Sequence, residues 1–122
     1  MRLNDVEFPS RPPIDGYAPG GFRIGGYAHP GGLLILPERV GDWAYDAPLT
    51  AASFERVIAA AGDLDLLLIG MGAEIAPLPR EARAALEAAG IAPEPMATPA
   101  ACRTYNVLIA EERRVGAALI PV

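Results

Sequence analysis

The sequence contains no lysine, and all ten of its basic residues are arginine. This absence excludes a P-loop lysine, a Schiff-base lysine and a lysine-rich tail. The formal net charge is −5, so the chain also lacks the basic face that usually marks a nucleic-acid-binding protein. We therefore expect no nucleic-acid partner.

Cysteine and histidine are equally scarce, with Cys102 and His29 the sole examples of each. A lone cysteine excludes an internal disulfide, and the pair excludes a four-ligand Cys/His zinc cluster, so we expect no metal site. No secretory signal is visible at the N-terminus. The longest uncharged apolar runs, 66–73 and 115–122, are far shorter than the roughly 20 residues that cross a bilayer. We expect a cytoplasmic protein without a transmembrane segment.

The length of 122 residues and the 52% share of hydrophobic residues are typical of one globular domain. Proline and glycine are concentrated near the N-terminus. We expect an irregular, proline-rich lead-in over residues 1–13 and a single domain over residues 14–122, which starts with a short strand at 14–17.

The spacing of apolar and turn-forming residues predicts the remaining elements. Apolar runs at 22–28 and 33–37 flank a Pro/Gly-rich tetrapeptide at 29–32, a pattern typical of a β-hairpin. The segment 64–70, apolar except for Asp65, predicts a central strand buried on both faces. Further expected elements are a short strand at 40–45, helices at 51–61, 79–90 and 98–112, a sheet-edge strand at 92–97 and a last strand at 115–121. Their alternation predicts an α/β layered domain.

Three residues mark the expected helix starts. Thr50 is the expected N-cap of the first helix, and Thr98, followed by proline, has the same role for the last helix. Pro79 is expected at the first position of the middle helix.

The last quarter of the chain carries the most specific pattern. Thr104-Tyr105-Asn106 lies within the segment 96–108, and Glu111-Glu112-Arg113-Arg114 follows it. Together with 22–24, 33–37, Trp43 and 68–72, this pattern resembles an uncharacterised α/β domain family. That family includes the mitochondrial respiratory complex I assembly factor 3 and the adipogenesis-associated domain protein. The resemblance spans roughly residues 14–122, the whole expected domain.

The resemblance implies a three-layer single domain, in which a central mixed sheet of about five strands lies between helices and a β-hairpin layer. It implies no catalytic residue and no cofactor. The eukaryotic members assist the assembly of a respiratory complex. Because no mitochondrial targeting segment is visible in this chain, we expect a bacterial or archaeal member.

A candidate pocket lies between Gly70–Gly72 and the N-terminus of the last helix. Glycines after a buried strand let a ligand approach backbone N–H groups, and the first turns of a helix favour an anion. The dinucleotide fingerprint is incomplete, because Ile75 stands where its third glycine belongs. The helix would contribute the side chains of Thr98, Cys102, Arg103, Thr104 and Asn106.

These residues also have a purely structural interpretation. The last helix is apolar nearly all round, which indicates that it is buried. Cys102 is then a small core residue, and Thr104 and Asn106 bond to neighbouring backbone. The competing hypothesis is a thiol-dependent role for Cys102, because a helix N-terminus lowers the pKa of a thiol.

Other polar and aromatic groups have weaker signals. His29 is expected in an exposed turn rather than in a dyad with Cys102, and 111–114 are expected to form a solvated helix end. The larger aromatic residues leave two options open, core packing and an exposed patch for a partner. They are Tyr17, Phe22, Tyr27, Trp43 and Tyr45.

The sequence shows no catalytic triad, metal-ligand set or nucleotide loop. This favours a non-enzymatic protein-interaction or assembly factor over an enzyme. The alternative is a small-molecule (anion) binding domain, or an enzyme, that uses the pocket between Gly70–Gly72 and the last helix. The ligand, the partner and the oligomeric state stay open.

Overall fold

Two sheets and three α-helices form the fold in a computed structural model, which describes the backbone of residues 6–7 and residues 11–122. The main sheet has six strands in the order β1-β6-β5-β9-β7-β8. Their bounds are β1 Val6–Glu7, β5 Leu33–Ile35, β6 Arg39–Asp42, β7 Leu66–Met71, β8 Ala92–Met96 and β9 Val115–Ile120. The small sheet consists of β2 Ile14–Ala18, β3 Gly21–Ile24 and β4 Tyr27–Pro30.

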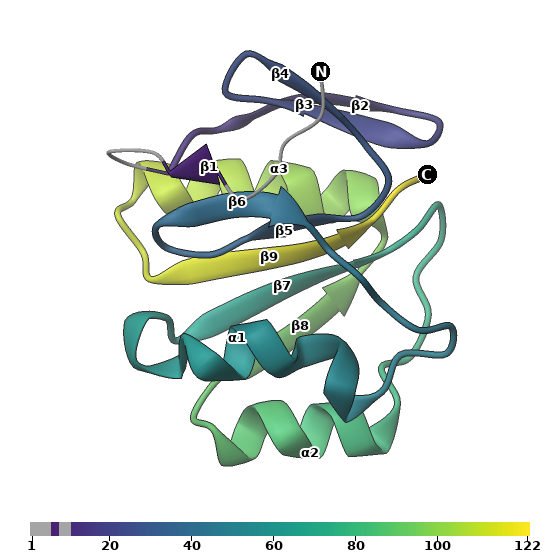
Figure 1. Ribbon diagram of the computed structural model, residues 1–122, viewed down its shortest axis with the longest axis vertical. Coiled ribbons are helices and arrows are strands. Elements are labelled where there is room, and N and C mark those ends of the chain that lie inside the picture. Colours follow the sequence, from purple (N-terminus) through teal and green to yellow (C-terminus); the bar gives the residue numbers. More distant parts are fainter. Residues whose placement is uncertain (1–5, 8–10) are drawn as a thin grey trace.

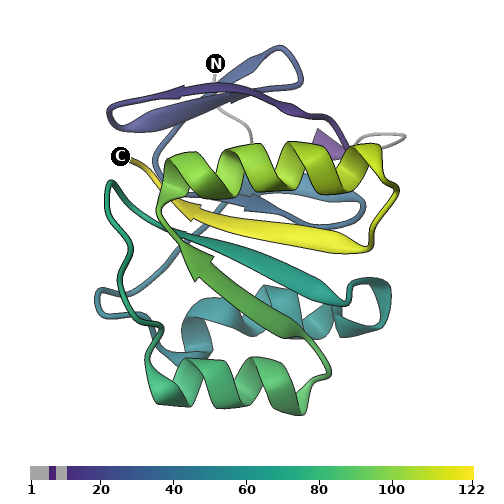
Figure 2. The ribbon, with the colours of Figure 1, turned by 180° about the vertical axis from the view of Figure 1, so that it is seen from behind.

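Helices and the small sheet cover the two faces of the main sheet (Figures 1 and 2). One face packs against the 3₁₀ turn Ala51–Phe54, α1 Glu55–Ala59 and α2 Arg80–Ala88. The other face packs against α3 Thr98–Ala110 and the inner side of the small sheet. Each face has its own apolar core, so the predicted layered α/β architecture is confirmed.

The predicted central strand is confirmed as β7, which runs parallel to both β8 and β9. Leu67, Leu68 and Ile69 alternate between the two cores, and each is almost fully buried. A strand that is buried on both faces needs a continuous apolar run rather than an alternating one. The sequence signal and the position in the sheet therefore agree.

The edge position predicted for β8 is also confirmed. Ala92 N–H donates to the carbonyl of Asp65 at 2.9 Å, and Thr98 N–H donates to that of Gly72 at 2.8 Å, so the even-numbered residues face β7. Pro93 and Pro95 consequently face the open edge, where they offer no N–H donor. A further strand cannot form a regular ladder there.

The predicted hairpin around residues 29–32 is wrong. The tight turn lies at Gly25-Gly26, which joins β3 to β4, and both glycines have positive φ angles of 56° and 84°. Two-residue hairpin turns of the primed types need such angles, and Gly-Gly supplies them without strain. Residues 31 and 32 instead connect β4 of the small sheet to β5 of the main sheet.

Thr50 is an N-cap as predicted, whereas the other two helix starts each differ from the prediction by one residue. Thr98 is the first residue of α3 and Ala97 is its N-cap, while Pro79 is the N-cap of α2. The expected helix 51–61 is divided into a 3₁₀ turn after Thr50, the short helix α1 and a second 3₁₀ turn, Ala61–Asp63. At the first of these, Thr50 N–H donates to the hydroxyl of Ser53 at 3.0 Å.

The expected lead-in contains a two-residue strand, because β1 pairs with β6. The rest of the expected lead-in up to residue 10 lies outside the described residues. No helix in the described part of the chain is long and apolar enough to span a membrane.

Candidate functional site

The structure brings Gly70, Gly72 and Thr98 together at the carboxyl end of β7. Thr98 Oγ1 donates to the carbonyl of Ile120 at 2.6 Å and accepts from the N–H of Gly72 at 2.9 Å. A Cβ built on Gly70 would lie 2.6 Å from that oxygen. The fully buried Thr98 side chain therefore fills the space above these glycines and joins α3 to β7 and β9. We refer to Gly70, Gly72, Thr98 and Ile120 as the Thr98 clasp.

Cys102 lies one turn further along α3, inside the core. Cys102 is 4% exposed and belongs to the same apolar cluster as Ala101 and Tyr105. Burial raises the pKa of the Cys102 thiol to about 11, although the charge of Arg103 opposes the rise. At neutral pH this thiol is protonated and shielded, which agrees with packing rather than with nucleophilic chemistry.

The three other residues predicted on this helix, Arg103, Thr104 and Asn106, lie in different environments. Arg103 is exposed, whereas Thr104 is half-buried. The Asn106 side chain accepts a hydrogen bond from Ile14 N–H at 2.7 Å and donates to the Ile14 carbonyl at 2.9 Å. Asn106 therefore occupies the free edge of β2 as a neighbouring strand would.

Two contacts beside Asn106 were not predicted from the sequence. The Tyr105 hydroxyl donates to the Pro12 carbonyl at 3.2 Å, and burial raises the pKa of this hydroxyl above its usual range while the charge of Arg11 opposes the rise. Arg11 itself donates to the carbonyls of Val115 and Arg113. These contacts fix the start of β2 to α3 and β9, which gives the Thr-Tyr-Asn segment a structural role.

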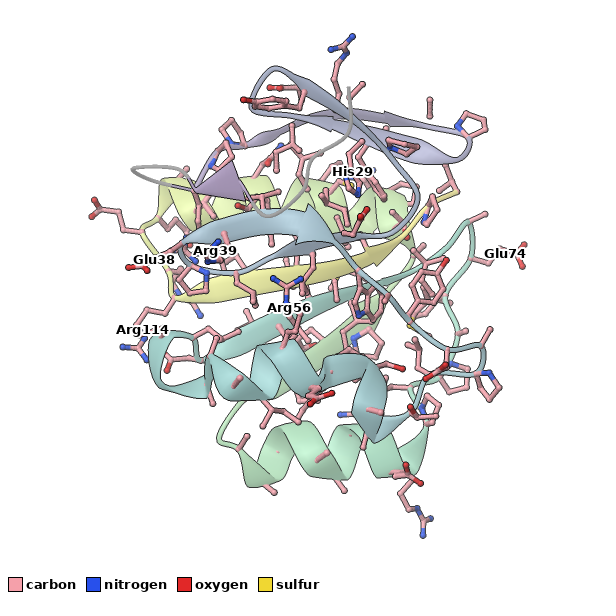
Figure 3. The ribbon with its side chains drawn as sticks, viewed as in Figure 1. His29, Glu38, Arg39, Arg56, Glu74 and Arg114 are labelled. Atoms are coloured by element: carbon pink, nitrogen blue, oxygen red, sulfur yellow. The ribbon has the colours of Figure 1, made fainter. Side chains whose placement is uncertain are left out.

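The prediction that His29 is exposed is wrong. His29 lies on β4 between the small and the main sheet, with 1% of its surface exposed (Figure 3). Its Nε2 is 2.9 Å from the Gly32 carbonyl and 3.1 Å from Oδ1 of Asp42. Because a carbonyl can only accept, Nε2 carries the proton. Nδ1 is buried and has no hydrogen-bond partner among the described residues.

The aromatic residues mostly belong to the core. Trp43 is buried, donates from Nε1 to the Ser53 carbonyl at 2.8 Å and packs in a tilted arrangement against the rings of Phe54 and Tyr45. Phe22 is buried as well. Tyr17 is 44% exposed at one end of the small sheet, so the structure contains no patch of all five aromatic residues.

The charged end of α3 is solvated, as predicted. The four residues Glu111 to Arg114 are exposed. Arg114 pairs with Asp65 at 3.3 Å and donates to the Gly62 carbonyl at 2.8 Å, both at the surface. Exposed pairs of this kind contribute little to stability. The described residues contain no cluster of three or more His, Cys, Asp or Glu side chains that could hold a metal ion.

A hollow of about 440 Å³ lies elsewhere, on the small sheet. All three strands line it, from Gly16 on β2 to Pro30 on β4. No sequence motif pointed to this surface, because it depends on how three strands are aligned.

Known proteins match almost the whole chain. A sequence model described as "Protein of unknown function (DUF498/DUF598)" matches residues 14–120. An uncharacterized protein of Rhodobacter capsulatus is 52% identical over 122 residues, which cover 100% of this chain and 94% of that protein. NADH dehydrogenase [ubiquinone] 1 alpha subcomplex assembly factor 3 of mouse is 35% identical over 123 residues, with 99% of this chain covered.

The chain spans only 66% of the length of that mouse protein. A solved structure from Bartonella henselae, described as an outer membrane protein, superposes with a TM-score of 0.88 at 40% identity. The superposition covers 94% of this chain and 98% of the other. The fold and the resemblance inferred from the sequence are confirmed.

Proposed function

The chain belongs to the DUF498/DUF598 family of proteins of unknown function, and from that premise we propose that it is a non-enzymatic protein-interaction or assembly factor. The observation that carries the proposal is its relation to assembly factor 3. At 35% identity, 99% of this chain aligns with the mouse protein of that name. A fold alone does not transfer a function, so the proposal also needs support from the side chains.

The contacts of the polar residues support it. Thr98, Tyr105 and Asn106 each use their polar atoms on the backbone of another segment. The Cys102 thiol is buried and protonated at neutral pH. Side chains that are committed to internal contacts are unsuited to substrate chemistry, which needs groups within reach of a reacting atom.

Co-purification from the native host tests the proposal. A tagged full-length chain, expressed from its own promoter, should elute in a complex well above its own mass of 12.8 kDa. Mass spectrometry should then recover a second protein in a fixed ratio. Elution as the free chain, or as copies of this chain alone, would contradict an assembly role.

Anion binding at the Thr98 clasp remains the alternative prediction. A ligand at 100 times its Kd stabilises a protein by about 2.7 kcal/mol, so a thermal-shift series with phosphate, pyrophosphate, nucleotides and carboxylates is decisive. The interaction role predicts no shift with any of them. An increase in melting temperature with one of these anions that disappears in the Arg103→Ala variant would favour the anion site over the assembly role.

A further inference from the structure

The two faces of the small sheet differ completely. Strand pairing aligns Phe22 with His29 and Ile24 with Tyr27 on the inner face, where Phe22, Ile24 and His29 are buried against α3 and the main sheet. Neighbouring residues in a strand point to opposite faces. The outer face consists of Gly16, Ala18, Gly21, Arg23, Ala28 and Pro30, and no other element of the described chain covers it.

Small side chains make this outer face hollow. A Cβ built on Gly16 meets no atom within 4 Å. Apart from Arg23, the largest side chain on this outer face is a proline ring. The resulting groove has a volume of about 440 Å³, within the range of about 300–1,000 Å³ that is typical of ligand sites. Most of its lining residues are exposed, so a small ligand would stay largely exposed in it.

Arg23 is the single charged residue that lines the groove. Its side chain is exposed, and no hydrogen bond or ion pair ties it to another residue in the part of the chain that the structure describes. The other lining residues are apolar or small, except the exposed Tyr17 and His29, whose side chain is buried. An unpaired guanidinium beside an apolar floor is complementary to a carboxylate on an otherwise apolar partner.

The strand edges of the small sheet do not favour a strand-addition mode. Asn106 already bonds both backbone groups of Ile14 on β2, and β4 ends in Pro30, which has no N–H. Recognition by strand addition needs a free row of backbone donors and acceptors. Binding therefore has to use the outer face rather than an edge.

We propose that the groove on the outer face of the small sheet docks an extended, mainly apolar segment of a partner protein, with an aspartate or glutamate of that segment paired with Arg23. This inference rests on the proposed interaction function and gives it a location. A single arginine is too little for a nucleic-acid backbone. The open shape suits a segment that continues beyond the groove at both ends.

Site-specific photo-crosslinking in the native host tests the inference. The photoreactive residue p-benzoylphenylalanine replaces Ala28 in the groove of the full chain or, as the control, the exposed Ala84 on α2 across the main sheet. Ala28 should crosslink to one partner, at a peptide that contains an aspartate or glutamate. Ala84 should not crosslink to that partner.

Charge reversal gives the second readout. Arg23→Glu should reduce the Ala28 crosslink about tenfold or more, because juxtaposed like charges strongly oppose binding. Arg103→Glu makes the same change in net charge at an exposed position of α3 and should leave the crosslink unchanged. Changing the acidic residue of the partner to arginine should restore binding to Arg23→Glu.

The contrary outcomes separate the two proposals. A partner that crosslinks at Ala84 but not at Ala28 overturns the groove and leaves the interaction role intact. An Ala28 crosslink that survives Arg23→Glu, or that reaches only lipid, nucleic acid or another copy of this chain, also overturns the groove. A chain that co-purifies with no partner and crosslinks at neither position removes the interaction role itself.

Discussion

Glycine has opposite roles at the Thr98 clasp and in the groove of the small sheet. At Gly70 a Cβ would lie 2.6 Å from Thr98 Oγ1 and 2.9 Å from Leu119 Cδ2, whereas at Gly16 it would meet nothing within 4 Å. The first glycine allows two elements to approach closely, and the second leaves a surface uncovered. A glycine next to a strand end is therefore no sign of a pocket until its neighbours are known.

The largest expected effect comes from adding one methyl group at each of these glycines. Gly70→Ala should reduce the free energy of unfolding by about 3 kcal/mol, because the new Cβ overlaps Thr98 in a close-packed interior. Gly16→Ala should change it by less than about 1 kcal/mol. Urea denaturation of both variants measures the difference, and similar values for the two would contradict the contrast between the two regions.

The reactivity of Cys102 gives the next largest effect. Its pKa rises from 9.0 to about 11 on burial, so at pH 8 the thiolate fraction should be about one hundredth of that in the unfolded chain. Alkylation by iodoacetamide should be slower by at least that factor than in a urea-unfolded control. A rate equal to that of the control would revive the thiol hypothesis.

The same shift makes stability depend on pH. Because the folded chain holds the thiol proton more tightly than the unfolded chain, the stabilisation is fully present below pH 9 and is lost as the pH rises toward 11. The Cys102→Ala variant has no thiol to ionise, so its stability should fall less than that of the original chain between pH 9 and pH 11. Denaturation midpoints at several pH values, compared between the two proteins, measure it.

A smaller loss is expected when the clasp loses its hydroxyl. Thr98→Val keeps the shape of the side chain but leaves the buried Gly72 N–H and Ile120 carbonyl without their partner, which should destabilise the chain by about 2 kcal/mol. Thr98→Ser keeps the hydroxyl and should lose about 1 kcal/mol through the missing methyl group. The reverse order in thermal denaturation would contradict the clasp.

The smallest stability effect concerns the edge of β2. Asn106→Ala removes two partly buried hydrogen bonds to Ile14 and should destabilise the chain by about 1 kcal/mol. Hydrogen exchange should reveal it locally, with faster exchange of the Ile14 amide and little change in β7. If amide exchange became equally faster in both sheets, the small sheet would not unfold separately from the main sheet.

The parts of the fold with strong local signals were predictable from the sequence. The apolar run of β7, the prolines of β8 and the helix α2 before Gly90 each reflect a property of a few neighbouring residues. His29 was misplaced because its burial depends on how β4 lies against the main sheet, where the pairing of β5 with β6 brings Asp42 close to its ring. Local sequence contains no record of such a contact.

The predicted site shows the same limit. Thr98 has the residue type and position of an N-cap, yet its hydroxyl bonds to Gly72 and Ile120, which belong to other strands. The groove escaped prediction because its lining becomes a surface only when β2, β3 and β4 are in register. Only in that register does Arg23 become the charged residue of the proposed docking groove.

The most direct measurement compares Arg23→Glu with Arg103→Glu in the amount of partner that co-purifies with the full chain. One arginine lines the groove and the other belongs to the predicted pocket, and both are exposed. Loss of the partner with Arg23→Glu alone is the result expected here. Loss with Arg103→Glu alone would place the functional surface at α3 and contradict the account.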